Sequence, residues 1–411
     1  MTDLDNLMPG TDRFAVYRWL NGQAEDAVCK PRTTLVKTFL LEHVRASEGR
    51  QPKTPEQIFG RLGCTLNRID ETFYGVTVQD REGGKAVGHL EQYDERFLAF
   101  YTTRPSQEAK PLVSKWCQEP DLDCCWFNGQ LLQQFWEQDV SKCGDNRFTK
   151  LVFKHDSIFE MPDSAIPPSE DGEDAESAVP LPDDDDVHDG ERRNARFEMA
   201  DRIGRIKKSL AKLQGEYAPL NALYSIRFPA AASGGSHNLF QHGQVTNHSP
   251  SFEEHRVKVR YFWRCYKQVL DATEEAAWEK PKKLSAALGG GQGVPLIVKF
   301  QERLSRETFD QWVSKAFQKR SPFKLWGRPI RLGPTKVHVY GADRHLWQPI
   351  TMELTDRGVV ALLPQGTCGN TFHRLVTNIQ HYLSPQIEAW LGSRKFGDLL
   401  RPDAIGKEEP V

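Results

Sequence analysis

The chain has 411 residues, of which 38% are hydrophobic and 27% are charged, a composition typical of globular proteins that allows two or three domains. No apolar run reaches the 18 or more residues that a membrane-spanning helix needs, and the acidic first twelve residues lack the apolar segment of a secretory signal. We therefore expect a cytoplasmic protein that makes no membrane contact.

The charge is distributed unevenly along the chain. Residues 191–411 carry 34 Lys and Arg against 21 Asp and Glu, whereas residues 163–190 carry eleven acidic residues and no Lys or Arg. A Pro- and Asp-rich segment of this kind buries too little apolar surface to offset its ordering entropy. We predict a mildly acidic N-terminal lobe (1–160), an acidic disordered linker (161–192) and a basic C-terminal lobe (193–411).

The N-terminal lobe is expected to combine helices with a mostly antiparallel sheet. An apolar stripe at helical spacing predicts that residues 14–46 are mainly helical. Three short β-type runs follow between residues 73 and 102, and a helix is expected over 107–118. The sequences DLDCCWF, GQLLQQFWEQ and FTKLVFKH then predict a strand, a helix and a strand.

The C-terminal lobe is predicted to open with a helix over 194–217. Its apolar residues recur at spacings of 4, 3, 4, 3 and 4, which is the pattern of a heptad seam; they are Met199, Ile203, Ile206, Leu210, Leu213 and Tyr217. Such a seam suits an amphipathic helix packed on its own lobe. It equally suits a helix that binds a protein partner or a second copy of the chain.

The rest of the C-terminal lobe alternates strands and helices. We expect a strand at ALYSIRF, a loop over 230–250, and a helix that begins at a capping box formed by Ser251 and Glu254. A strand (PLIVKF), a helix, three strands and a final helix follow; their expected ranges are 295–300, 306–317, 337–341, 348–354, 359–363 and 371–382.

The fold class we predict is α+β, with two mixed lobes, mainly antiparallel sheets and flanking helices. Residues 73–118 and 336–382 share the order of three strands and one helix. A distant internal duplication is one explanation of this shared order. Chance is the other, because three strands and a helix are a common arrangement.

A basic run between residues 311 and 342 carries no Asp or Glu. Cations that neutralise phosphates beside rings that stack on bases are what nucleic-acid binding requires. We predict nucleic-acid contacts, with DNA and RNA undistinguished, from Lys315, Lys319, Arg320, Lys324, Trp326, Arg328, Arg331 and Lys336. An acidic protein partner, or charges that are simply solvated, would explain the same run.

The final helix offers a second candidate surface. Its apolar residues form one stripe, and the opposite side carries hydrogen-bond donors that include His373, Arg374 and Asn378. We add these three residues to the predicted nucleic-acid site. An ordinary amphipathic helix is the alternative.

An enzymatic alternative centres on Cys368, at a predicted turn between a strand and the final helix. A helix N-terminus lowers a thiol pKa, and His373 or His237 could then act as the base of a cysteine-dependent hydrolase or peptidase. The histidines of residues 237–255 and the cysteines of residues 117–143 lack the spacing of known metal motifs. We therefore expect neither a metal nor another cofactor.

These observations favour a non-enzymatic, cytoplasmic, nucleic-acid-associated subunit of a larger assembly, with the basic lobe holding the phosphates. The cysteine-dependent hydrolase is the first alternative, and a protein–protein adaptor without nucleic-acid contact is the second. A role in antiviral defence would suit such a protein, although no residue supports it.

Overall fold

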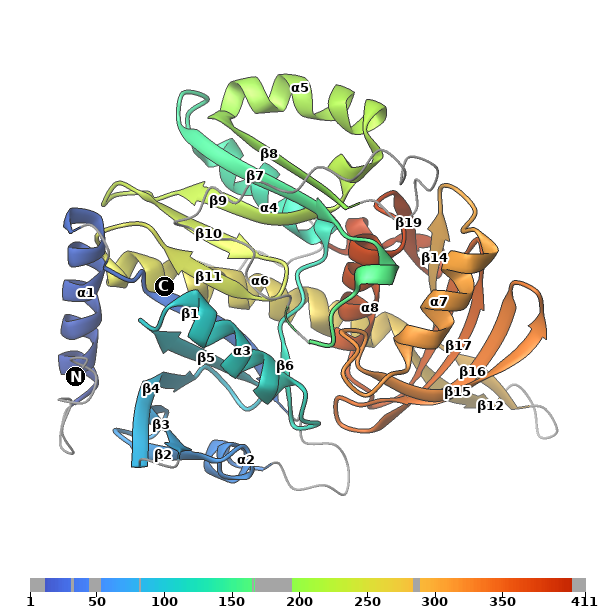
Figure 1. The fold of residues 1–411 in the computed structure, drawn as a ribbon, viewed down its shortest axis with the longest axis horizontal. Coiled ribbons are helices and arrows are strands. Elements are labelled where there is room, and N and C mark those ends of the chain that lie inside the picture. Colours follow the sequence, from blue (N-terminus) through green and yellow to red (C-terminus); the bar gives the residue numbers. More distant parts are fainter. Residues whose placement is uncertain are drawn as a thin grey trace.

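A computed structural model describes most of the chain. The described residues are 12–30, 33–43, 53–80, 83–164, 166, 194–283 and 289–400. The predicted acidic linker lies almost entirely outside them. In the described residues the fold is α+β with two mainly antiparallel sheets, as predicted, and helix α8 lies between the sheets (Figure 1). No described helix is long and apolar enough to cross a bilayer.

Eight α-helices are described. They are α1 (Arg13–Cys29), α2 (Pro55–Arg61), α3 (Ser106–Cys117), α4 (Gly129–Lys142), α5 (Ile203–Glu216), α6 (Phe252–Ala277), α7 (Arg306–Ala316) and α8 (Asn370–Tyr382). Several begin at side-chain caps that satisfy the free amides of the first turn. Ser251, for example, accepts a hydrogen bond from the Glu254 amide and starts α6, the helix start that the sequence predicted.

The first sheet has eleven strands in the order β2-β3-β4-β5-β1-β11-β10-β9-β7-β8, with β6 paired to β1. The strands are β1 (Lys37–His43), β2 (Cys64–Arg68), β3 (Phe73–Asp80), β4 (Gly83–Gln92), β5 (Phe97–Thr102), β6 (Leu122–Cys124), β7 (Phe148–His155), β8 (Ala195–Arg202), β9 (Leu223–Pro229), β10 (Ser236–Phe240) and β11 (Gln244–Asn247). Strands β8 to β11 follow the expected linker and nevertheless belong to this sheet. The two sheets therefore divide after residue 247, not at residues 161–192.

The second sheet runs in the order β15-β16-β17-β18-β14-β19-β20, and β12 pairs with both β18 and β13. Its strands are β12 (Trp278–Lys283), β13 (Gly289–Gln292), β14 (Leu296–Phe300), β15 (Leu325–Gly333), β16 (Lys336–Asp343), β17 (Gln348–Thr355), β18 (Gly358–Pro364), β19 (Ile387–Leu391) and β20 (Arg394–Lys395). Among the pairings of the described strands, only the short one between β12 and β18 is parallel.

Each sheet contains one copy of the same topology. We name residues 37–124 the first module and residues 296–391 the second module. The strand order is β2-β3-β4-β5-β1-β6 in the first and β15-β16-β17-β18-β14-β19 in the second. A helix follows the first strand of each module (α2 or α7), and another follows the fifth (α3 or α8). The match thus extends from the four elements seen in the sequence to eight, which favours an internal duplication.

The sheet of the first module is covered by helices on both faces. Side chains alternate across a strand, so Phe100 packs edge-on against Trp116 of α3, and its neighbour Tyr101 packs against Phe252 of α6. All seven residues of β1 are buried as a result. A strand buried on both faces does not show the apolar–polar alternation of a strand with one exposed face.

Three sequence predictions need correction. The expected helix over 14–46 ends at Cys29, and residues 37–43 form β1, because a buried apolar run resembles a helical stripe. Met199 lies on β8, so the helix expected over 194–217 begins at Ile203. The loop expected over 230–250 contains β10 and β11, which pair with each other and with β9 and β1.

The apolar seam of α5 faces the interior of the protein. Ile203, Ile206 and Leu210 are buried in the main core of the chain. These side chains are therefore not available to a partner helix in this conformation, and self-association through α5 would need another surface.

Candidate functional site

One face of the second module is open to solvent. Its opposite face packs residues such as Val339 and Met352 into the core with Trp312 of α7 and Phe372 of α8. The outward-facing side chains form rows across the strands. One row joins Arg328, Tyr340 and Thr351, and the next joins Ile330, His338, Glu353 and Val360. We name this outer side of β15–β18, together with Trp326 and Trp347, the open face.

Large aromatic side chains stand exposed on the open face. The exposed fraction is 57% for Trp326, 66% for Tyr340 and 50% for Trp347. The rings of Trp326 and Trp347 meet edge-on, with centroids 6.4 Å apart. Ile330 and Leu332 on β15 are also about half exposed. Exposed apolar patches that are rimmed by polar residues mark binding surfaces.

The open face carries more cations than anions. Arg328 is exposed and forms no ion pair with a described residue, whereas Lys336 and His338 both contact Glu353. Outside the open face, Lys319 and Arg320 in the turn after α7 are exposed as well. The surface therefore joins aromatic rings to uncompensated positive charge.

A cavity of about 410 Å³ continues this surface towards the first module. Leu346 and Trp347 line one side, and Ile58 of α2 lies on the other. The basic residues Lys53 and Arg61 also line it, and both pair with Asp121. Since Trp347 belongs both to the cavity and to the open face, one ligand could occupy both.

The predicted nucleic-acid residues of the basic run divide into two groups. Six are exposed, namely Lys319, Arg320, Trp326, Arg328, Arg331 and Lys336, although Arg331 pairs with Asp310. Lys315 is partly buried and donates to the carbonyl of Phe159 at 2.6 Å. Lys324 is buried and donates to the carbonyls of Glu119 and Leu122, at 3.0 and 2.5 Å. Lys324 therefore joins the two modules and does not reach the surface.

The polar side of α8 is also internal, which corrects its assignment as a nucleic-acid surface. Every residue of α8 is buried, because the helix lies between the two sheets (Figure 1). Arg374 donates to Asp123 of β6 and to Asp343 of β16, and Asn378 donates to the carbonyl of Pro322. These side chains satisfy partners inside the protein.

His373 is buried in the same way. It contacts the amide of Asn128 and the hydroxyl of Thr273. Burial lowers the pKa of His373 to about 3, with a smaller contribution from the positive charge of Arg96. The ring is therefore neutral at physiological pH and structural in its contacts.

Cys368 lies in a buried cluster at the start of α8. Its thiol donates to Glu42 Oε1 at 3.1 Å, and Arg96 donates to both Glu42 and Glu274. Burial raises the pKa of Cys368 well above its usual value, and the charge of Glu42 adds to the effect. A nucleophilic thiolate needs the opposite environment.

The bases proposed for Cys368 are also occupied elsewhere. His373 is bonded as described above, and His237 lies 3.4 Å from His255, nitrogen to nitrogen. In the described part of the chain, no hydrogen bond joins the Cys368 thiol to a histidine. The geometry therefore does not support the cysteine-hydrolase alternative.

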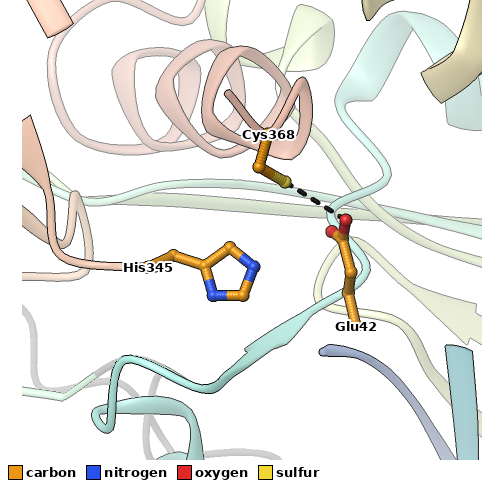
Figure 2. A group of neighbouring side chains, drawn as sticks. All are labelled: Glu42, His345 and Cys368. Atoms are coloured by element: carbon orange, nitrogen blue, oxygen red, sulfur yellow. Dashed lines mark hydrogen bonds between the residues drawn. The ribbon is translucent and has the colours of Figure 1, made fainter. Parts of the chain in front are cut away.

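The Cys368 thiol belongs to a cluster of possible metal ligands that the sequence did not predict. Potential metal-ligand atoms of Glu42, His345 and Cys368 lie within 4.8 Å of one another, and Figure 2 shows the three side chains facing a common point. They come from β1, from the turn between β16 and β17, and from the loop before α8. No motif spacing could link positions so far apart in the sequence.

The residues matched by the family comparison include both modules. The chain belongs to the MJECL33-like protein family, whose profile matches residues 16–178 and 236–396. It is similar to the uncharacterized protein MJECL33 of Methanocaldococcus jannaschii, with 22% identity over 413 residues, which cover 95% of this chain and 96% of that protein. No solved structure matches the chain significantly.

Proposed function

We propose that this protein binds single-stranded nucleic acid across the open face of the second module, as a non-enzymatic component of a larger cytoplasmic assembly. The observation that carries the proposal is the exposure of Trp326, Tyr340 and Trp347 together with Arg328, which forms no ion pair with a described residue. Three large rings facing water on one sheet surface have no role in the core.

Base stacking supplies the affinity in this proposal. Each stacked base contributes about 1–3 kcal/mol and requires no particular sequence, because every base has a π face. A duplex hides its base faces within the stack, whereas a single strand can offer them to an exposed sheet. The aromatic surface therefore favours a single strand over a double helix.

Phosphate contacts would fix the path of the strand. Arg328 lies in the same cross-strand row as Tyr340, so a base stacked on the ring places its phosphate within reach of the guanidinium. Lys319 and Arg320 add exposed positive charge to the same module, and the cavity beside Trp347 is large enough to accept a base. An acidic peptide would also meet the cations, but it would leave the rings without planar partners.

The test uses fluorescence anisotropy with labelled oligonucleotides and the full-length protein. We expect salt-dependent binding to a single strand, weakened roughly 5- to 150-fold by Trp326→Ala, since one stacking contact is lost. Phe148→Ala is the matched control, because Phe148 is 65% exposed on β7 of the first sheet. It should bind with unchanged affinity.

A charge variant tests the phosphate contacts separately. Replacing Lys319, Arg320 and Arg328 by Glu should abolish binding and leave the melting temperature unchanged, because all three are exposed. Arg205→Glu with Lys208→Glu, on the exposed side of α5, is the control. Unchanged affinity of both the alanine and the charge variants would overturn the proposed function.

A further inference from the structure

The cluster around Cys368 has buried polar atoms without partners. Glu42 Oε2 and His345 Nε2 are both shielded from solvent and accept no hydrogen bond from, and donate none to, any described residue. A buried polar group that is left without a hydrogen bond destabilises the folded state. Two such atoms pointing into one group of three side chains indicate a ligand that both of them bind.

A hydrogen bond at Nδ1 of His345 fixes the protonation of the ring and so leaves Nε2 as the possible metal ligand. His345 Nδ1 lies 3.1 Å from the carbonyl oxygen of Pro120, so it carries the proton and donates it to that oxygen. The lone pair is then on Nε2, which faces Glu42 and Cys368 (Figure 2). Metal-bound histidines are held by the same kind of outer hydrogen bond.

The charges of the cluster also suit a divalent cation. Two carboxylates, Glu42 and Glu274, share the single guanidinium of Arg96. With the Cys368 thiolate the group carries three negative charges and one positive charge. A divalent cation would bring the net charge of the cluster to zero, and charges buried in a protein need such compensation.

We propose that Glu42, His345 and Cys368 form a zinc site that joins the first module to the second. Zn²⁺ would take the Cys368 thiolate, His345 Nε2 and one oxygen of Glu42, with water as the fourth ligand. The thiol proton leaves to solvent when the metal binds, and a proton on Glu42 would leave as well. A thiolate and an imidazole select zinc over Mg²⁺ or Ca²⁺, which prefer oxygen ligands.

The site needs only a small contraction. Ligands of a tetrahedral zinc ion lie about 2.0–2.3 Å from the metal. The three ligand atoms, now within 4.8 Å of one another, would therefore move together by roughly an ångström. The site is independent of the open face, so each proposal can fail without the other.

The test is cobalt substitution in the full-length protein. After chelator treatment, the chain is titrated with Co²⁺ and then with Zn²⁺. We expect one equivalent of Co²⁺, a thiolate-to-cobalt charge-transfer band in the absorption spectrum, and displacement by Zn²⁺. Zinc should also raise the melting temperature, since it binds the folded state.

Two conservative variants and one control identify the ligands. Cys368→Ser keeps the size and the hydrogen bond to Glu42 but removes the thiolate, and His345→Gln can still donate to Pro120. Both should lose the band and the thermal shift. Cys29→Ser, at an exposed cysteine of α1, should keep both. The absence of a charge-transfer band in the unmodified chain, or its persistence in Cys368→Ser, would overturn the zinc site.

Discussion

The two modules share one topology but differ in what covers their sheets. In both, a pair of helices (α2 and α3, or α7 and α8) packs on the corresponding face. The other face of the first module is covered by α1 and α6, and Tyr101 there is fully buried. The other face of the second module is uncovered by any described helix and exposes Tyr340. One module therefore serves the core and the other presents a surface.

This difference shows which strand positions the fold constrains to be buried and which it leaves free to vary. A sheet covered on both faces buries every position of its strands, as in β1 and β5, so each side chain must be apolar or must find a polar partner inside the protein. A sheet covered on one face buries side chains only at alternate positions. The remaining positions of the second module are free to carry exposed tryptophan, tyrosine and arginine.

The largest expected effect is the loss of the first sheet in acid. His43, His89, His155 and His237 lie on its strands, and burial lowers the pKa of each to about 4. Below the unfolded-state pKa of about 6.5, the unfolded chain takes up protons that the folded chain does not. Stability should fall by up to about 1.4 kcal/mol per pH unit for each histidine, and should be lost before pH 4.

Hydrogen exchange measured at pH 7 and pH 5 checks this expectation. Amides of β1, β4, β7 and β10 should lose protection between the two values. Equal protection of these strands at both values would mean that the histidines are protonated in the folded state, and would contradict the expected loss of stability in acid.

A smaller effect is expected where the modules meet. Arg374→Met leaves Asp123 and Asp343 buried without their partner, which should lower the free energy of unfolding by about 3–5 kcal/mol. Arg331→Met removes an exposed pair with Asp310 and should change it by at most about 1 kcal/mol. Urea denaturation at neutral pH compares the two variants. Similar values for both would show that Arg374 is not needed to join the modules.

The smallest effect on stability should come from the open face. Trp116→Ala, in the covered module, removes a fully buried ring and should cost about 3–5 kcal/mol. Tyr340→Ala should change the free energy of unfolding by no more than about 0.5 kcal/mol. Thermal denaturation of both variants tests the contrast. A large loss of stability in the Tyr340 variant would contradict the exposure of this ring, because it would mean that the ring is buried in a contact.

The sequence predicted the position of elements with a clear apolar periodicity well, and that of elements without one poorly. Helices α3, α7 and α8 and the strands at 337–363 show a clear apolar stripe or alternation, and each was expected close to its observed position. Strand β1 is buried on both faces and was mistaken for helix. Strand β15 was missed, because Gly327 and Pro329 interrupt it and its exposed residues are themselves apolar.

The candidate site was predicted in part. The basic run included Trp326 and Arg328, which the structure places on the open face, while Tyr340 and Trp347 carried no distinctive local pattern. Arg374 was assigned to solvent because its partners, Asp123 and Asp343, lie 251 and 31 residues away in the sequence. Whether a polar helix face meets water or a second sheet depends on such distant pairings, which a single sequence does not reveal.

The position of β11 has a consequence for synthesis of the chain. Strand β1 pairs with β11 through Lys37 and Thr246, about 200 residues further along. At ribosomal rates of about 5–20 residues per second, one edge of β1 would wait roughly 10 to 40 seconds for that partner. An unpaired apolar edge is a site of aggregation during such a delay. Expression of this protein should therefore benefit from slow growth or from chaperones that bind nascent strands.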